Sequence, residues 1–145
     1  MTLSLMNKTG NRLVWNNLGT YFGQIKNGLK HGLGQMRYNT GELYIGYWEN
    51  DKRHGKGKMT YPSGKVYKGE WKKDMRNGYG KMVDKDGDEY ILYEGEWKDN
   101  EMHGQGKCIF SNGNKYIGMW KNAFLHKGTY TYTDGEWYEG DFKNN

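Results

Sequence analysis

The chain has 145 residues, of which 23 are glycine and 16% are aromatic, with a mean hydropathy of −1.11 and a net charge of +5. This composition does not describe a compact core of Leu, Ile and Val. A single cysteine excludes an internal disulfide framework and is typical of a reducing compartment, and no apolar run is long enough to predict a transmembrane helix.

Residues 1–20 form the one region without a recognisable pattern. The first eight residues are too short and too polar to predict a signal peptide. Leu13, Val14 and Trp15 suggest a strand or cap that covers the first edge of whatever follows. We therefore predict an N-terminal cap or irregular segment over residues 1–20, followed by a repeat array over residues 21–145.

The array is defined by a phrase of tyrosine, glycine and tryptophan at alternate positions, usually followed by lysine. The phrase or a near variant recurs roughly every 23 residues, at 21–26, 44–49, 67–72, 93–98, 116–121 and 138–143. A fixed period of this length predicts a repeat architecture, in which each unit buries its face against its neighbours.

Two further landmarks separate successive phrases. A Gly-x-Gly, such as Gly55-Lys-Gly57, is followed by a turn in which glycine comes after a short polar residue, such as Ser63-Gly64. Such glycines supply the positive φ that hairpin connections need, and Tyr, Trp and Thr at alternate positions favour strands. The sequence therefore predicts an all-β fold, a single elongated, twisted antiparallel meander of stacked β-hairpins.

These residues resemble the MORN (membrane occupation and recognition nexus) repeat. The resemblance runs from Tyr21 to Asn145 and covers five full units plus a final half unit. The first unit departs from the pattern with Ile25 in place of tryptophan, and the fifth keeps only Gly128 of its Gly-x-Gly. The resemblance implies a repeat array of a kind found alone, in cytoskeletal and flagellar proteins, and beside catalytic domains.

Alternation along each strand places the repeat tyrosines and tryptophans on one face and alternating Glu and Lys on the other. One interpretation is an open aromatic trough that binds a peptide or helix of a protein partner. The alternative is that twist closes the trough, so that the rings only hold the sheet together. The predicted trough residues are Tyr44, Trp48, Tyr67, Trp71, Tyr93, Trp97, Tyr116 and Trp120.

Charge separates the two long edges of the predicted meander. The connections after the first strand of each unit carry an excess of Lys and Arg, and the opposite turns carry an excess of Asp and Glu. An anionic partner or phospholipid headgroups would suit the basic edge, and solvated charge that keeps the sheet soluble is the alternative. The densest cluster, called the basic rim below, is Lys52, Arg53, Lys72, Lys73 and Arg76.

No residue pattern predicts a catalytic or metal site. His31, His54, His103 and His126 share one repeat position and are predicted to lie in turns roughly 10 Å apart, too far for a shared metal ion. Cys108 occupies a position held elsewhere by methionine and is predicted to pack as a small apolar residue. We therefore predict no enzyme activity, no cofactor and no metal.

The spacing slips by three residues between Asp88 and Tyr93. An odd insertion exchanges the two faces of a strand unless a bulge absorbs it. A bulge or a longer turn is expected at this point.

The favoured function is a non-catalytic scaffold or adaptor that presents its aromatic face to a protein partner, possibly in a cytoskeletal or axonemal assembly. The alternative is a peripheral module that binds anionic phospholipid through the basic rim. Nucleic acid is not expected as a partner, because the lysines alternate with glutamates on one face. We expect a cytoplasmic protein, with association with the cytoskeleton or a cilium as one setting, and the final strand at residues 138–143 offers an edge for self-association.

Overall fold

The computed structural model describes residues 3–6 and 10–143, and these ranges contain strands and turns without a helix. It follows that none of them forms a helix long and apolar enough to cross a membrane. The chain divides into two compact units, Met1–Met75 and Arg76–Asn145.

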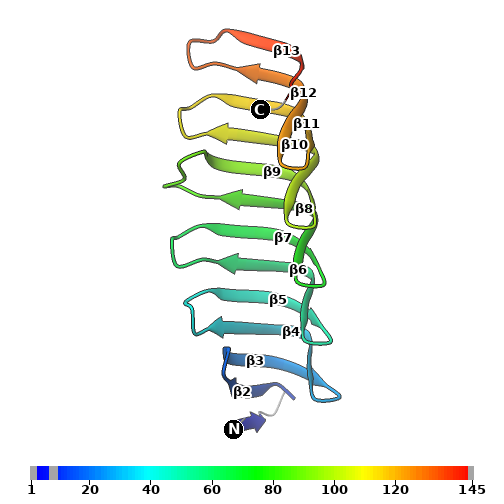
Figure 1. The fold of residues 1–145 in the computed structure, drawn as a ribbon. Coiled ribbons are helices and arrows are strands. Elements are labelled where there is room, and N and C mark those ends of the chain that lie inside the picture. Colours follow the sequence, from blue (N-terminus) through cyan, green and yellow to red (C-terminus); the bar gives the residue numbers. More distant parts are fainter. Residues whose placement is uncertain (1–2, 7–9, 144–145) are drawn as a thin grey trace. The chain divides into compact units, whose positions relative to one another are not determined.

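The first unit is an antiparallel meander in which each strand pairs with the next one along the chain. Figure 1 shows this order from blue to green. The predicted strand at Leu13–Trp15 lies within β2, which pairs with β3. The strands are β1 (Leu3–Met6), β2 (Arg12–Asn16), β3 (Gly19–Lys26), β4 (Leu29–Tyr38), β5 (Leu43–Glu49), β6 (Lys52–Thr60) and β7 (Val66–Lys72).

The second unit repeats the same plan, again with each strand paired antiparallel to its neighbour in sequence. The prediction of an all-β antiparallel meander of stacked hairpins is confirmed in both units. Its strands are β8 (Met75–Val83, starting at the last residue of the first unit), β9 (Tyr90–Lys98), β10 (Glu101–Phe110), β11 (Lys115–Lys121), β12 (Phe124–Thr131) and β13 (Trp137–Asp141).

The connection after the first strand of each repeat is a turn of only two residues. Between β5 and β6, Asn50 and Asp51 both have positive φ, 47° and 67°, as a two-residue type I′ turn requires. Strand pairing therefore resumes at Lys52. The prediction that the four histidines lie in turns is wrong for this reason, since they lie inside β4, β6, β10 and β12.

The turns on the other side of the repeats match expectation. Gly41 has φ 101°, and its N–H donates to the Tyr38 carbonyl at 3.0 Å. The insertion near Asp88 is absorbed by a longer turn and a bulge, because Leu92 pairs with Ile109 while Tyr90 pairs with Phe110. Tyr93 consequently keeps the repeat position of the other tyrosines, and the predicted bulge is confirmed.

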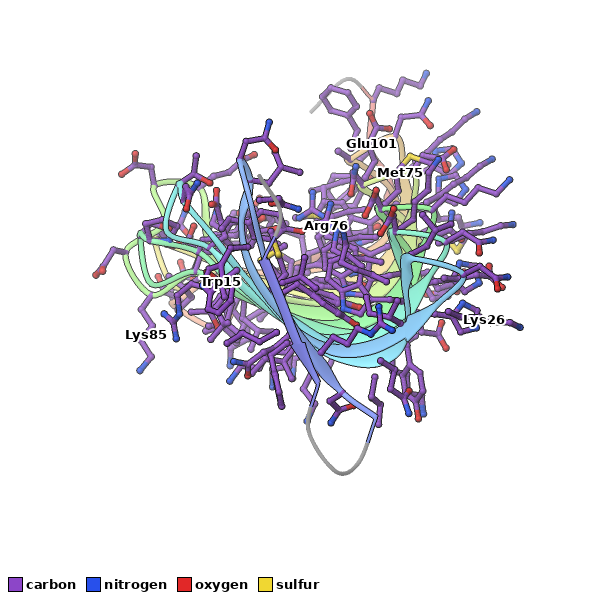
Figure 2. All side chains as sticks on the ribbon, turned by 90° about the horizontal axis from the view of Figure 1, so that it is seen from below. Trp15, Lys26, Met75, Arg76, Lys85 and Glu101 are labelled. Atoms are coloured by element: carbon purple, nitrogen blue, oxygen red, sulfur yellow. The ribbon has the colours of Figure 1, made fainter. Side chains whose placement is uncertain are left out.

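A bulge recurs inside the hairpins and was not predicted. Between β5 and β6, Gly46 pairs with Gly57 while Trp48 pairs with Arg53, so β6 carries extra residues at this point. Gly55, within the bulge, has φ 63°. Bulges bend a strand and increase its twist. In the view of Figure 2 the ribbon is bent, and we call the inner side, toward which Arg76 points, the concave face.

The core lies on this concave face and is mostly aromatic. Repeat tyrosines, tryptophans and a row of methionines are its buried members, with Cys108 at one methionine position. They are Tyr21, Tyr44, Tyr67, Tyr93, Tyr116, Trp48, Trp71, Trp97, Trp120, Met36, Met59, Met82, Met102 and Cys108.

Candidate functional site

Each repeat tyrosine is seated on the glycines of the neighbouring strand. The Tyr44 hydroxyl donates a hydrogen bond to the Tyr47 carbonyl at 2.9 Å, which fixes the ring flat against the sheet. A Cβ added at Gly57 would lie 2.2 Å from the Tyr44 hydroxyl oxygen, so only glycine leaves room for the ring. The same hydroxyl-to-carbonyl bond occurs at Tyr21, Tyr67, Tyr93, Tyr116 and Tyr138.

Each repeat tryptophan joins two repeats. The Trp48 ring packs edge to face against Tyr44 of its own repeat, with centroids 5.0 Å apart, and against Tyr21 of the preceding repeat, at 5.6 Å. Its indole N–H donates to the Gly34 carbonyl at 3.2 Å. Corresponding indole bonds join Trp71 to Gly57 and Trp97 to Gly80. Aromatic pairs of this kind contribute about 0.5–1.5 kcal/mol each beyond their buried area.

The eight predicted trough residues are therefore all buried by the chain itself, with exposed fractions between 0% and 5%. Their burial fits the alternative in which the rings hold the sheet together. Contact of these rings with a partner stays a prediction. It is most open at Trp97 and Trp120, which line the groove described below.

A cation covers the tryptophan ring in three successive repeats. These cations occupy the position nine residues after the repeat tyrosine. Lys30 Nζ lies 5.2 Å from the Trp48 ring centroid, and the guanidinium carbons of Arg53 and Arg76 lie 4.6 Å from the rings of Trp71 and Trp97. A cation over an indole face is favourable by about 0.5–1 kcal/mol at exposed sites.

The cation is held by a side chain from the next type I′ turn. Asp51 pairs with Lys30 at 3.2 Å, and Asp74 pairs with Nε of Arg53 at 3.0 Å. Asn100 takes this place for Arg76, accepting from its backbone N–H at 2.9 Å and from its Nε at 3.3 Å. We call the cation together with its Asp or Asn partner the clamp.

The clamp is missing from the last two repeats. Met102 and Leu125 stand at the cation position, and Ala123 stands where Asp51, Asp74 and Asn100 stand in the other turns. The Ala123 N–H still donates to the Met102 carbonyl at 3.0 Å, so the backbone geometry of the turn is kept. What changes is the cover over the rings, because short apolar side chains replace a charged pair.

A groove of about 750 Å³ lies at this place, entirely within residues 76–145. Its apolar lining includes Trp97, Met102, Trp120, Leu125 and Phe142. On the side of the turns in which glycine follows a short polar residue, the groove is bordered by a partly exposed aromatic cluster. In this cluster the Phe110 and Tyr130 rings lie 5.4 Å apart. Arg76, Glu89 and Glu101 are the charged residues along the lining. An apolar cleft with a few polar groups is the usual form of a binding site.

A smaller hollow of about 540 Å³ adjoins the groove and shares Phe124, Leu125 and Phe142 with it. Its other lining residues include Lys121, His126 and Lys143, so this side is basic.

Trp120 differs from the other repeat tryptophans in one further respect. Its Nε1 is buried and has no hydrogen-bond partner within residues 10–143, whereas Trp48, Trp71 and Trp97 each donate to a glycine carbonyl. A buried donor without a partner costs about 1–3 kcal/mol. The groove is thus lined by the repeat tryptophan whose indole N–H lacks the hydrogen bond that Trp48, Trp71 and Trp97 make.

Sequence reasoning missed this groove because it followed the tyrosines and tryptophans and not the residues that cover them. The signal was present at one repeat position, which reads Lys30, Arg53, Arg76, Met102 and Leu125.

The predicted basic rim is divided by the structure. Lys52, Lys72 and Lys73 are exposed, whereas Arg53 and Arg76 lie over tryptophan rings and bond to Asp74 and Asn100. Binding of an anionic partner or phospholipid through this rim stays a prediction. Self-association through the last strand also stays a prediction; there Trp137 is 65% exposed.

The residues considered for catalysis or metal binding stay apart. In the described part of the chain no group of three or more His, Cys, Asp or Glu side chains comes together to hold a metal ion. His54 Nδ1 lies 3.7 Å from a Glu49 carboxylate oxygen, an isolated pair. Cys108 is fully buried, and this burial, with a smaller effect from Glu89, raises the pKa of its thiol to about 12.

The fold is similar to that of a solved protein. The TCP domain of Drosophila melanogaster SAS-4 (dCPAP), solved in complex with a proline-rich motif of Ana2 (dSTIL), superposes with a TM-score of 0.55 at 16% sequence identity. The match covers 94% of this chain and 75% of that one, and at this identity it shows likeness of fold alone. A search of curated protein sequences gave no match.

The repeat pattern itself is matched by a family model. The model for the MORN repeat fits residues 21–42, 44–66, 67–89, 93–115 and 116–137, which together make up most of the chain. These spans begin at or beside the repeat tyrosines whose hydroxyls, glycine seats and indole contacts are described above. The chain therefore belongs to the MORN repeat family.

Proposed function

We propose that this chain is a non-catalytic adaptor that holds a segment of another protein in the groove of residues 76–145. The observation that carries the proposal is the loss of the clamp at Met102, Ala123 and Leu125, which coincides with the groove. Where the clamp is present, the tryptophan ring is already covered by the chain's own cation. Where it is absent, a partner can take the place of that cover.

The chemistry of the groove suits a protein segment. Its rings are fixed by hydrogen bonds and edge contacts. A ligand that packs on them therefore loses conformational entropy itself, but little conformational entropy of the protein is lost on binding. Aromatic side chains in packed, desolvated positions are the usual source of binding energy between proteins. The solved neighbour of similar fold is in complex with a proline-rich motif, which supports the choice of a peptide partner.

The cellular setting is a separate matter from the adaptor role. A cytoplasmic location and a cytoskeletal or axonemal assembly rest on the family resemblance and stay predictions. The adaptor role is independent of them, because it depends on the groove and not on where the partner resides.

The test is a variant that rebuilds the clamp over Trp120. Met102→Arg with Ala123→Asp copies the Arg53–Asp74 pair at the equivalent repeat positions. We expect this closed variant to fold, because its backbone already has the turn geometry of the clamped repeats, and to lose its partner. The matched control, Ile117→Arg with Met119→Asp, makes the same kind of change at side chains that are 59% and 37% exposed on the convex face.

The readout is affinity capture from cells that contain the protein, with the wild type, the closed variant and the control compared by mass spectrometry. A partner that is captured by the wild type and the control but not by the closed variant supports the proposal. Equal capture by all three proteins, with circular dichroism showing that all are folded, refutes it.

A further inference from the structure

Building on the proposed function, we infer that the groove of residues 76–145 binds a polyproline II segment with an apolar residue at every third position. Three features of the groove favour this conformation, namely the spacing of its apolar sites, the indole N–H of Trp120 and the distribution of charge along the lining.

The groove offers two apolar sites that repeat with the hairpins. One is formed by Met102 with Trp97 and Trp120, and the next, one repeat further along the chain, by Leu125 with Trp120 and Phe142; all five residues line the groove. Successive hairpins are two strand spacings apart, about 9.5 Å. One turn of polyproline II, at 3.1 Å per residue and three residues per turn, advances about 9.3 Å.

Other peptide conformations match this spacing less well. Residues on the same face of a β-strand recur about every 6.7 Å, so alternate side chains fall out of step with the hairpins. An α-helix returns to the same face after seven residues, about 10.5 Å, and its diameter of about 10–12 Å demands a wide groove. Polyproline II therefore places one side chain on each apolar site with the smallest mismatch.

Hydrogen bonding favours the same conformation. The backbone carbonyls of polyproline II make no internal hydrogen bonds, whereas those of a helix do. Trp120 Nε1 has no partner among the described residues, so turning this indole toward a ligand carbonyl breaks no hydrogen bond of the protein. The same movement at Trp97 would break its bond to the Gly80 carbonyl.

The charge of the groove lining determines which residue types suit the centre and the end of the bound segment. The side chains that form the two apolar sites are themselves uncharged, so the ligand side chains that enter these sites are apolar, while Arg76, which lies over the Trp97 ring, and Glu89 and Glu101 line the groove beside them. The adjoining hollow is lined by Lys121, His126 and Lys143, which favours an acidic residue at the end of the segment that reaches it.

The probes are synthetic peptides of defined conformation, titrated into the full chain. The first is a repeated Leu-Pro-Pro sequence that ends in glutamate. The second has the same composition with its leucines placed next to one another, and the third is an amphipathic helix with leucine at every seventh position. Binding is followed by the nuclear magnetic resonance signal of the Trp120 indole N–H, assigned with Trp120→Phe.

We expect the first peptide to bind and to shift the Trp120 indole signal, and the second to bind about tenfold more weakly or worse. The closed variant should bind neither. Tighter binding of the helical peptide to this groove would overturn the inference and leave the adaptor function intact. Failure of all three peptides, alongside a cellular partner that requires the groove, would also overturn it, whereas the absence of any groove-dependent partner would refute the proposed function itself.

Discussion

Raising the pH should unfold this protein cooperatively, because the repeat tyrosines must stay protonated to remain buried. Tyr21, Tyr44, Tyr93 and Tyr116 are 0–1% exposed. Burial is the largest cause that raises the pKa of each of these hydroxyls above its usual value near 10. In the unfolded chain the same groups ionise near pH 10.

The direction of the effect follows from proton counting. Above pH 10 the unfolded chain has lost tyrosine protons that the folded chain keeps, so the free energy of unfolding falls as the pH rises. Below pH 10 both states are protonated and these groups give no pH dependence. Each tyrosine lowers the free energy of unfolding by at most about 1.4 kcal/mol per pH unit, so the four together cost roughly 4–6 kcal/mol by pH 11. A loss of this size is comparable to the whole stability of a small domain.

The assay records circular dichroism and tyrosinate absorbance on the same samples across the alkaline range. We expect both signals to change together in one steep step above pH 10. On neutralisation both signals should return to their starting values. Tyr44→Phe should be less stable at neutral pH by about 1–2 kcal/mol, because the Tyr47 carbonyl loses its donor, and it should show a shallower pH dependence. Tyr47→Phe, at a side chain that is 49% exposed, is the matched control.

One result would refute this reasoning. If tyrosinate absorbance rose gradually around pH 10 while the circular dichroism kept its folded form, the buried rings would be ionising in place. The seating of the tyrosines on glycine would then contribute far less to stability than the structure indicates.

Three further predictions concern single features. Gly57→Ala should destabilise the chain by about 2–4 kcal/mol in denaturant titrations, because its Cβ would overlap the Tyr44 ring; Gly64→Ala, with open space but φ 86°, should cost only about 1–2 kcal/mol. Thiol labelling of Cys108 should be slow in the folded chain and rapid in denaturant, and rapid labelling without unfolding would contradict its burial. Liposome flotation should show weak binding that salt abolishes, since three exposed lysines of the basic rim supply only about 1 kcal/mol each, and tight flotation with anionic vesicles that salt weakens would instead favour the phospholipid alternative.

The hairpins could be predicted from the sequence because their signals are local. Tyrosine, glycine and tryptophan at alternate positions identify the strands, and a glycine such as Gly41 or Gly113 marks a turn that requires positive φ. The bulge near Asp88 was predictable for the same reason, since a change in spacing must be absorbed where it occurs.

Features that depend on contacts between repeats were not predictable in the same way. The sequence does not mark the two-residue connections at Asn50-Asp51 and Asn122-Ala123, because a type I′ turn with Asp or Ala at positive φ lacks the glycine that usually signals it. The trough residues were identified, but their burial depends on curvature from bulges, and the first glycine of each Gly-x-Gly indicates a bulge only once its positive φ is known. The groove requires knowing that Arg53 lies over Trp71 before the absence of a cation at Met102 has meaning.

The tryptophans give the array a particular mechanical property. Trp48 contacts both Tyr21 and Tyr44, and Trp71 contacts both Tyr44 and Tyr67, so each of these two hairpins is joined to its predecessor by a ring that it supplies itself. One such repeat could therefore be deleted or duplicated at equivalent positions, because the tryptophan of the following repeat would still meet a tyrosine of the repeat before it.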